Sequence, residues 1–141
     1  MANVTTQAKA TKRQYLVNIQ GIPGTWRAFT GGGGTASVTK DYNGGSDRAD
    51  LLAGPAEWDD IEVTRTVAPS RDDAWVEQLN KLIGRGEFTV TKQSTDANWN
   101  RVGKPRTYPA CLLTGVQESE TDAASSDAAE IKLTFATSGP A

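Results

Sequence analysis

The residue types that usually carry catalysis are sparse in this chain of 141 residues. Histidine is absent, which removes the commonest general base and metal ligand of proteins. A Ser-His-Asp or Cys-His arrangement is therefore impossible within the chain. Cys111 is the only cysteine. Its place between Ala110 and Leu112, inside a strand-like segment, favours a small buried apolar side chain over a reactive nucleophile.

Two acidic pairs and one glycine run are the remaining candidates for chemistry. Asp59-Asp60 precedes a predicted strand, and Asp72-Asp73 opens a predicted helix, where negative charge suits the helix dipole. Capping and solvation explain both pairs better than acid–base catalysis does. The run 31–34 (Gly-Gly-Gly-Gly) lacks the Lys-Ser/Thr of a phosphate-binding loop, so it indicates a flexible or closely packed loop. The sequence predicts no enzyme, no cofactor and no metal site.

The composition fits one domain with a modest core. Hydrophobic residues make up 37% of the chain, the mean hydropathy is −0.50 and the net charge is −2, which argues against a protein that holds nucleic acid by charge. Residues 1–56 carry six Lys/Arg against three Asp, whereas residues 57–141 carry nine Lys/Arg against fourteen Asp/Glu. Such an asymmetry suits head-to-tail contacts between identical copies, although a scatter of solvated charges would also produce it.

Apolar and polar residues alternate in several segments, as in strands with one buried face. The predicted strands cover residues 15–20, 26–29, 61–67, 87–91, 108–117 and 130–135. One helix is predicted over residues 72–83, with Ser70 or Asp72 as its N-cap residue. Its apolar face carries Trp75, Val76, Leu79, Leu82 and Ile83. The order of strands, helix and strands predicts a mainly β fold, a small β-sandwich or barrel flanked by an α-helix.

Two segments stand apart from these elements. Residues 1–13 are polar and predict a flexible N-terminal arm, which leaves residues 14–138 as a single domain. Residues 30–57 show no periodicity and contain several glycines. A structureless loop of this length is uncommon in a compact domain and is usually functional or disordered. We expect a long loop between the second and third strands that becomes ordered against a partner.

The predicted strands carry rows of polar residues opposite their apolar faces. An ordinary solvated sheet face explains such rows equally well. If several copies closed their sheets into a ring, the rows would instead form a wet channel wall. The candidate lumen-facing residues are Glu62, Thr64, Thr66, Thr89, Thr91, Glu130, Lys132 and Thr134.

Over about residues 15–137, the chain resembles the tail tube family of contractile phages. The segments that carry the resemblance are Lys40–Asp47, Leu52–Pro55, Ile61–Arg65, Arg71–Val76, Thr107–Leu113 and Leu133–Phe135. The resemblance implies a β-sandwich subunit flanked by a helix, with six copies in a ring and rings stacked into a hollow tube. Strands of all six inner sheets join into one barrel around the lumen.

The same resemblance implies what the subunit contacts. The long loop reaches a neighbouring subunit or ring, and the residues expected at such contacts are Asp41, Tyr42, Asp47, Arg48, Leu51, Leu52 and, in a second polar loop, Trp99. The other implied partners are a baseplate or similar initiator, a tape-measure protein and genomic DNA in the lumen, and a tail sheath if the tail contracts. The implied location is the virion, after synthesis in the cytoplasm of the bacterial host. No membrane anchor is expected, because no apolar run reaches spanning length.

Three alternatives remain open. Within the same class, the chain would form the tube of a non-contractile tail, a bacteriocin particle or a type VI secretion system. In a different class, the chain would be a β-sandwich module that binds carbohydrate through Trp99. This alternative predicts a stable monomer. An enzyme would need a mechanism that uses only Asp and Glu, with two carboxylates converging in one deep pocket.

Overall fold

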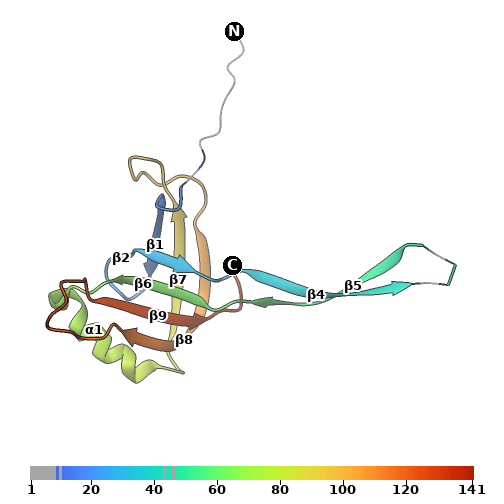
Figure 1. Cartoon of the computed structure of the whole chain (residues 1–141). Coiled ribbons are helices and arrows are strands. Elements are labelled where there is room, and N and C mark those ends of the chain that lie inside the picture. The colour runs from blue at the N-terminus through green and yellow to red at the C-terminus, as the bar shows by residue number, and fades with distance from the viewer. Residues whose placement is uncertain (1–8, 10, 43, 46) are drawn as a thin grey trace, which may run out of the picture.

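The computed structural model describes residue 9 and residues 11–42, 44–45 and 47–141. Of the predicted N-terminal arm, residues 1–8 and 10 lie outside this described part. The elements are β1 (Tyr15–Ile19), β2 (Thr25–Trp26), β3 (Ala28–Thr30), β4 (Gly34–Tyr42), β5 (Ala49–Trp58), β6 (Ile61–Thr66), α1 (Pro69–Leu82), β7 (Glu87–Ser94), β8 (Arg106–Glu118) and β9 (Glu130–Ala136). The prediction of a mainly β fold with one flanking helix is confirmed (Figure 1).

Seven strands form one antiparallel sheet in the order β2-β1-β7-β8-β9-β6-β3. The sheet curls until it nearly closes into a barrel, and β1 and β7 run almost across the direction of β6 and β9 (Figure 1). The long strand β8 joins the two halves, because it pairs first with β7 and then with β9. A register shift interrupts each of these pairings, and such bulges let a strand bend.

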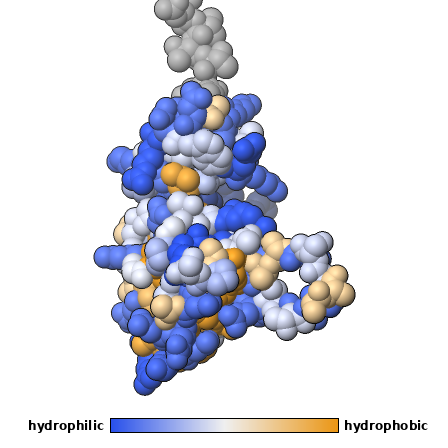
Figure 2. Space-filling model, turned by 90° about the vertical axis from the view of Figure 1, so that its left-hand side faces the viewer, coloured by the Kyte–Doolittle hydropathy of each residue, from blue (hydrophilic) through white to orange (hydrophobic). Residues whose placement is uncertain are grey.

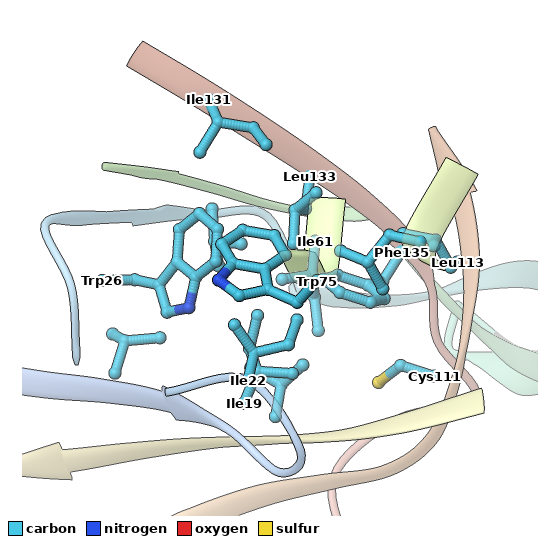
Figure 3. Close-up of a cluster of buried hydrophobic side chains, with 14 of the residues drawn as sticks. Ile19, Ile22, Trp26, Ile61, Trp75, Cys111, Leu113, Ile131, Leu133 and Phe135 are labelled. Atoms are coloured by element: carbon cyan, nitrogen blue, oxygen red, sulfur yellow. The ribbon is translucent and has the colours of Figure 1, made fainter. Parts of the chain in front are cut away.

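The hydrophobic core lies between the two halves of the sheet (Figure 3). Rings from one half meet rings from the other: Phe88 of β7 lies 5.9 Å from Phe135 of β9, centroid to centroid, and Phe29 of β3 lies 5.9 Å from Tyr108 of β8. The buried apolar side chains of the strands include Val17, Ile19, Ile61, Val63, Val90, Leu113, Ile131, Leu133 and Phe135. Because both inner faces point at this core, the outer faces of the two halves point away from each other.

The helix α1 packs Trp75, Val76 and Leu79 onto this core, which confirms most of the predicted apolar face. The predicted start of the helix is wrong by three residues. The helix begins at Pro69, and its N-cap residue, Ala68, makes no side-chain capping bond. Proline is well suited to the first turn, because its fixed φ matches the helix and its missing N–H would have no partner there.

The predicted strand 26–29 is also wrong as a single element. Arg27 separates two short strands that lie at opposite ends of the sheet order: β2 pairs with β1, and β3 pairs with β6. The chain crosses here from one half of the sheet to the other. Both strands are too short to show a period of their own, which is why the sequence pattern merges them.

Residues 30–57 form an excursion between β3 and β6, as predicted, but they are not a structureless loop. The strands β4 and β5 pair with each other in a separate two-stranded sheet that projects far from the body (Figure 1). Backbone hydrogen bonds pair the N–H and C=O groups that point from each strand to the other, and the outward groups face solvent. The segment therefore forms strands although it buries almost no side chains.

Candidate assembly interface

The residues that could do chemistry are either buried or dispersed. Cys111 is fully buried, its Sγ–H donates to the Tyr108 carbonyl at 3.2 Å, and burial raises the pKa of its thiol. The prediction of a buried apolar filler is thus confirmed. Within the part of the chain that the structure describes, no three His, Cys, Asp or Glu side chains gather where they could hold a metal ion. In the same residues, no helix is long and apolar enough to cross a membrane.

The outer part of the hairpin β4–β5 has two chemically different faces. Residues directly opposite in an antiparallel pair share a face, and here Val38 pairs with Ala53, Lys40 with Leu51, and Tyr42 with Ala49. We call the set Val38, Lys40, Tyr42, Ala49, Leu51 and Ala53 the apolar hairpin face, since Lys40 is its only charged member. Leu51 is 68% exposed, Tyr42 63% and Val38 54%. Three large apolar side chains, each more than half exposed to solvent, thus share one face.

The opposite hairpin face is polar and acidic. It pairs Thr39 with Leu52 and Asp41 with Asp50, so that two carboxylates stand on directly opposed positions. Leu52 is the only large apolar residue of this face. Because side chains alternate between faces, the neighbours Leu51 and Leu52 project to opposite sides of the hairpin.

The base of the hairpin is closely packed. The Asp59 N–H donates to the Gly33 carbonyl at 2.9 Å, and the Gly32 N–H donates to the Asp59 carbonyl at 3.2 Å. The ring of Trp58 lies against two glycines, since a Cβ on Gly34 would approach it to 2.6 Å and one on Gly139 to 2.5 Å. Of the two readings of the glycine run, the closely packed loop is the one observed. Because glycine has no side chain, the run lets the base of the hairpin lie directly against the body.

Gly31→Ala is expected to destabilise the subunit by roughly 2 kcal/mol or more. Gly31 has φ +86°, and an added Cβ would lie 1.8 Å from the Asp60 carbonyl oxygen, so the backbone must move. Urea unfolding followed by tryptophan fluorescence measures the loss. Gly44→Ala is the matched control, because a Cβ there meets no atom within 4 Å. Equal unfolding midpoints for the two variants would show that the hairpin base tolerates the movement.

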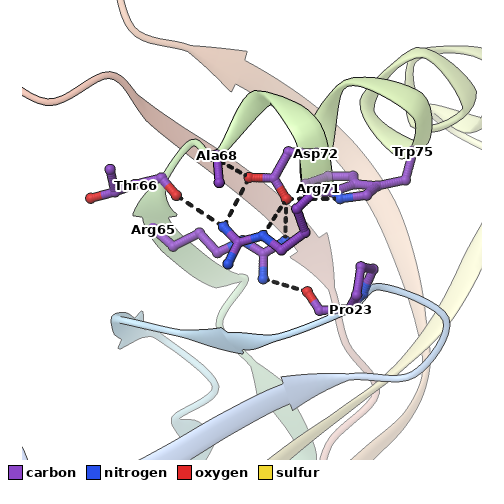
Figure 4. A network of polar contacts seen from close by, with 7 residues as sticks. All are labelled: Pro23, Arg65, Thr66, Ala68, Arg71, Asp72 and Trp75. Carbon is purple, nitrogen blue, oxygen red and sulfur yellow. Dashed lines mark hydrogen bonds and ion pairs between the residues drawn. The ribbon is translucent and has the colours of Figure 1, made fainter.

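A buried ion network fixes the helix next to the first strands (Figure 4). The carboxylate of Asp72, which is fully buried, accepts hydrogen bonds from Arg65 Nη2 at 2.9 Å, Arg71 Nε at 2.8 Å and Trp75 Nε1 at 2.9 Å. It also accepts the Ala68 N–H at 2.8 Å. The hydrogen bond from Arg71, together with the other donors, holds the pKa of Asp72 far below its usual value.

The partner guanidinium is buried as well. Arg65 is 3% exposed, and its Nη1 donates to the Pro23 carbonyl in the turn after β1 at 2.6 Å. Its charge lies 4.3 Å from the ring centroid of Trp26 and 5.1 Å from that of Trp75. Burial lowers the pKa of Arg65, while Asp72 opposes this shift. The prediction of Asp72 as a possible N-cap residue is wrong, since Ala68 is the N-cap residue, and solvation is excluded because Asp72 is fully buried. The expected acid in the first turn is confirmed, and its carboxylate accepts the N–H of Ala68 as one contact of this ion network.

Six of the eight candidate lumen-facing residues lie together. On the neighbouring strands β6 and β9, Glu62 is opposite Thr134, Thr64 opposite Lys132, and Thr66 opposite Glu130. They occupy the outer face of this half of the sheet, since the alternating residues Ile61, Val63, Ile131 and Leu133 are buried. The charges on this face pair within it or at its rim: Lys132 Nζ lies 3.4 Å from Glu62, and Arg27 lies 2.5 Å from Glu130.

The other two candidates are on the opposite side of the subunit. Thr89 and Thr91 flank the buried Val90 on β7, and Thr91 pairs with Asn18 of β1 and Thr107 of β8. They therefore belong to the outer face of the β1–β7 half, which points away from the face of β6 and β9. A single channel wall formed by one half of the sheet cannot include all eight residues.

The predicted contact residues are likewise divided between different surfaces of the subunit. Tyr42 and Leu51 lie on the apolar hairpin face and Asp41 and Leu52 on its polar face, while Asp47 and Arg48 are exposed near the hairpin tip. Trp99 is elsewhere, in the loop between β7 and β8, which lies at the top of the view in Figure 1 and away from the hairpin. Its side chain is 46% exposed, and its backbone has φ 63°. The guanidinium of Arg13 lies 5.6 Å from the centroid of its ring.

Val38 belongs to the apolar hairpin face but is missing from the predicted contact residues. A signal for it exists in the sequence: Val38, Lys40 and Tyr42 are spaced by two, as are Ala49, Leu51 and Ala53. The glycines that flank both runs hide this period, because they suggest turns rather than strands. Only the pairing of the two runs shows that their apolar residues share one face.

Comparison with known proteins shows a shared fold at low sequence identity. No protein-family model and no curated protein matches the chain. A chain of the anti-feeding prophage (AFP) tube terminating cap matches 99% of this chain and 94% of its own, with 14% identity and a TM-score of 0.80. A chain of the sheath–tube complex of PVC, an extracellular contractile injection system in the extended state, matches 94% and 90%, with 14% identity and a TM-score of 0.76.

A third similar structure comes from the six-fold symmetrised AFP baseplate. One of its chains matches 96% of this chain and 96% of its own, with 17% identity and a TM-score of 0.73. The likeness extends over nearly the whole chain in all three cases. The prediction of a tail-tube-like fold, made from the resemblance to contractile phage tails, is confirmed.

Proposed function

We propose that this protein is a structural subunit that assembles with copies of itself into a hollow tube, either of a phage tail or of a phage-tail-like contractile injection particle. The observation that supports this most is the projecting hairpin, whose apolar face has no cover in the single subunit. An apolar surface exposed on a thin two-stranded arm marks an interaction site, because isolated two-stranded sheets are at best marginally stable in water. The tail-tube-like fold supports a tube as the assembly that covers it.

The proposed assembly is a stack of six-membered rings. The apolar hairpin face of each subunit packs against a neighbouring copy in the same ring or in the next one, which buries Tyr42 and Leu51. Burial of these side chains provides a driving force of about 25 cal/mol per Å² of apolar area. Repetition of one such contact between identical copies produces a ring or an open tube.

The outer face of β6 and β9 is the proposed channel wall. Six candidate residues gather on it, and its cations Lys132 and Arg27 are already engaged by Glu62 and Glu130. Fixed cations that remain free would hold the phosphates of passing DNA, whereas a polar wall with internally paired charges lets a polyanion slide. For Thr89 and Thr91 the proposal is different, namely the outer side of the tube.

The proposed partners follow from this role. The tube grows from a baseplate or similar initiator, surrounds a tape-measure protein and then DNA, and lies inside a sheath if the particle contracts. The proposed location is the virion or the injection particle, after synthesis in the bacterial cytoplasm. No catalytic step is part of the proposal.

Negative-stain electron microscopy of the purified chain at high concentration, with its mass in solution, tests the proposal. We expect hollow rings or tubes with six-fold end views and masses in multiples of six subunits. A subunit that stays monomeric at every concentration, also after addition of a matching baseplate, would contradict it. In that case a glycan screen comparing the unaltered chain with Trp99→Ala would examine the carbohydrate-binding alternative.

A further inference from the structure

Lysine and arginine side chains gather at the seam where the curled sheet fails to close. The strands β1 and β3 face each other across this seam, because β2 covers only the last part of β1. A hollow of about 440 Å³ lies between them and adjoins one of about 110 Å³, the two sharing Tyr15 and Lys92. The cations of the two linings are Lys12, Arg13, Arg27, Lys92, Lys104 and Arg106, which we call the basic seam.

The basic seam has almost no internal counter-charge. No Asp or Glu takes part in lining either hollow. Among the described residues, Arg27 is the only cation of the set within ion-pair distance of a carboxylate, that of Glu130. Lys92 lies 4.9 Å from the ring centroid of Tyr15 and 5.0 Å from that of Phe29. The rings hold this ammonium in place without neutralising it.

A surface of the opposite charge lies in the loop between β8 and β9. Residues 118–130, which we call the acidic loop, carry Glu118, Glu120, Asp122, Asp127 and Glu130 and no Lys or Arg. All but Glu130 are exposed, and Glu130 is the only one that pairs with a cation in the described residues. The loop curves around an open hollow of about 920 Å³ lined by residues 119–129, so that cationic side chains of a partner have access to it.

Apart from Arg27 and Glu130, which pair with each other within the subunit, the two charged surfaces are displaced from each other. Arg106 begins β8 and Glu118 ends it, so most of the basic seam and the acidic loop lie at opposite ends of the longest strand. Figure 2 shows that the upper part of the face on the left of Figure 1, below the grey N-terminal residues, is dominated by hydrophilic side chains. A contact between one end of a subunit and the other end of the next is head-to-tail, and such contacts continue into rings or filaments.

We infer that the basic seam of one subunit binds the acidic loop of a second copy. This rests on the proposed function in taking the partner to be another copy of the chain. Charge complementarity favours the loop over the hairpin as the occupant, because Asp41, Asp47 and Asp50 of the hairpin are accompanied by Lys40 and Arg48, whereas the acidic loop contains no cation. The net charge of −2 for the whole chain argues against nucleic acid as the partner of the seam.

Charge reversal in both surfaces tests the inference. One variant carries Glu118→Lys, Glu120→Lys and Asp127→Lys, and the other carries Lys12→Glu, Lys104→Glu and Arg106→Glu. Each alone is expected to self-associate about a hundredfold more weakly than the unaltered chain, since like charges then meet at the contact. An equimolar mixture of the two is expected to recover association, measured by analytical ultracentrifugation, and higher salt is expected to weaken it.

A third variant is the control, in which the exposed Asp73, Glu77 and Glu87 are changed to lysine, and it is expected to associate normally. Tubes formed by each reversed variant alone would overturn the inference and leave the proposed function standing. Binding between the two reversed variants, without any tubes from the unaltered chain, would support the inference and contradict the tube. A basic seam that binds a short DNA duplex but not the acidic variant would also overturn the inference.

Discussion

Leu51→Asp is expected to prevent the purified chain from assembling, whereas Leu52→Asp is expected to assemble. The two leucines are neighbours with exposures of 68% and 55%, so the two changes are alike in chemistry and in their effect on the single subunit. Only Leu51 lies on the apolar hairpin face with Val38 and Tyr42. Leu52 projects from the other side, next to Thr39.

The expected loss for Leu51→Asp is about 2 kcal/mol or more per contact, roughly 30-fold in the association constant. A carboxylate in a dry apolar contact must be desolvated without a partner, and the proposed tube would repeat this penalty at every subunit. Sedimentation velocity and electron microscopy measure the association. Far-UV circular dichroism checks that both variants keep the fold, which is expected because neither side chain takes part in the core.

A larger change removes the outer part of the hairpin β4–β5. Because Val38 pairs with Ala53, replacing residues 38–53 by Asn-Gly leaves a short hairpin with a favoured two-residue turn. This design cuts both strands at matched positions, whereas removal of residues 31–52 would leave β5 without its partner. Equal assembly by Leu51→Asp, Leu52→Asp and the shortened chain would show that the hairpin is not the contact between copies.

The second large effect is expected for Asp72→Ala, which should lower the free energy of unfolding by about 3–5 kcal/mol. The change leaves the buried Arg65 guanidinium without its carboxylate and removes the acceptor for Trp75 Nε1 and the Ala68 N–H. Denaturant unfolding measures the loss. Asp73→Ala is the control, since Asp73 is exposed on the same helix, and its expected effect is within about 0.5 kcal/mol. A loss for Asp72→Ala of no more than that of the control would show that the network contributes no net stability.

The network also predicts how stability depends on pH. The pKa of Asp72 is depressed in the folded subunit, chiefly by the hydrogen bond from Arg71, so the unfolded state binds the proton more readily than the folded state does. The contribution of Asp72 is therefore fully present above its unfolded pKa of about 4 and is lost as the pH falls below it towards the folded value. Between pH 8 and pH 5 the difference in stability between the unaltered chain and Asp72→Ala should stay constant.

Several elements in the body of the subunit can be predicted from the order of residues alone. Alternation predicts strands over residues 61–67 and 130–135, within one residue of β6 and β9, because a half-buried sheet enforces a period of two. Helical spacing of Trp75, Val76 and Leu79 likewise identifies the buried face of α1. The residues around Cys111 indicated correctly that its thiol is buried.

The contacts between these elements cannot be predicted from local sequence, because they join residues that lie far apart in the chain. From its neighbours in the sequence, Asp72 is recognisable only as a residue at the start of a helix. Its buried partner Arg65 lies on the preceding strand, so the ion pair becomes evident only in the structure. The polar rows of β6 and β7 look equivalent in sequence, yet the curl of the sheet through β8 turns their outer faces away from each other. In residues 30–57 the flanking glycines hide the pattern of a strand pair, and the apolar face that this pattern produces meets no core within the subunit. Apolar periodicity in a sequence arises from burial within the subunit. On a face that is exposed in the single subunit, such as the apolar hairpin face, the periodicity is harder to detect.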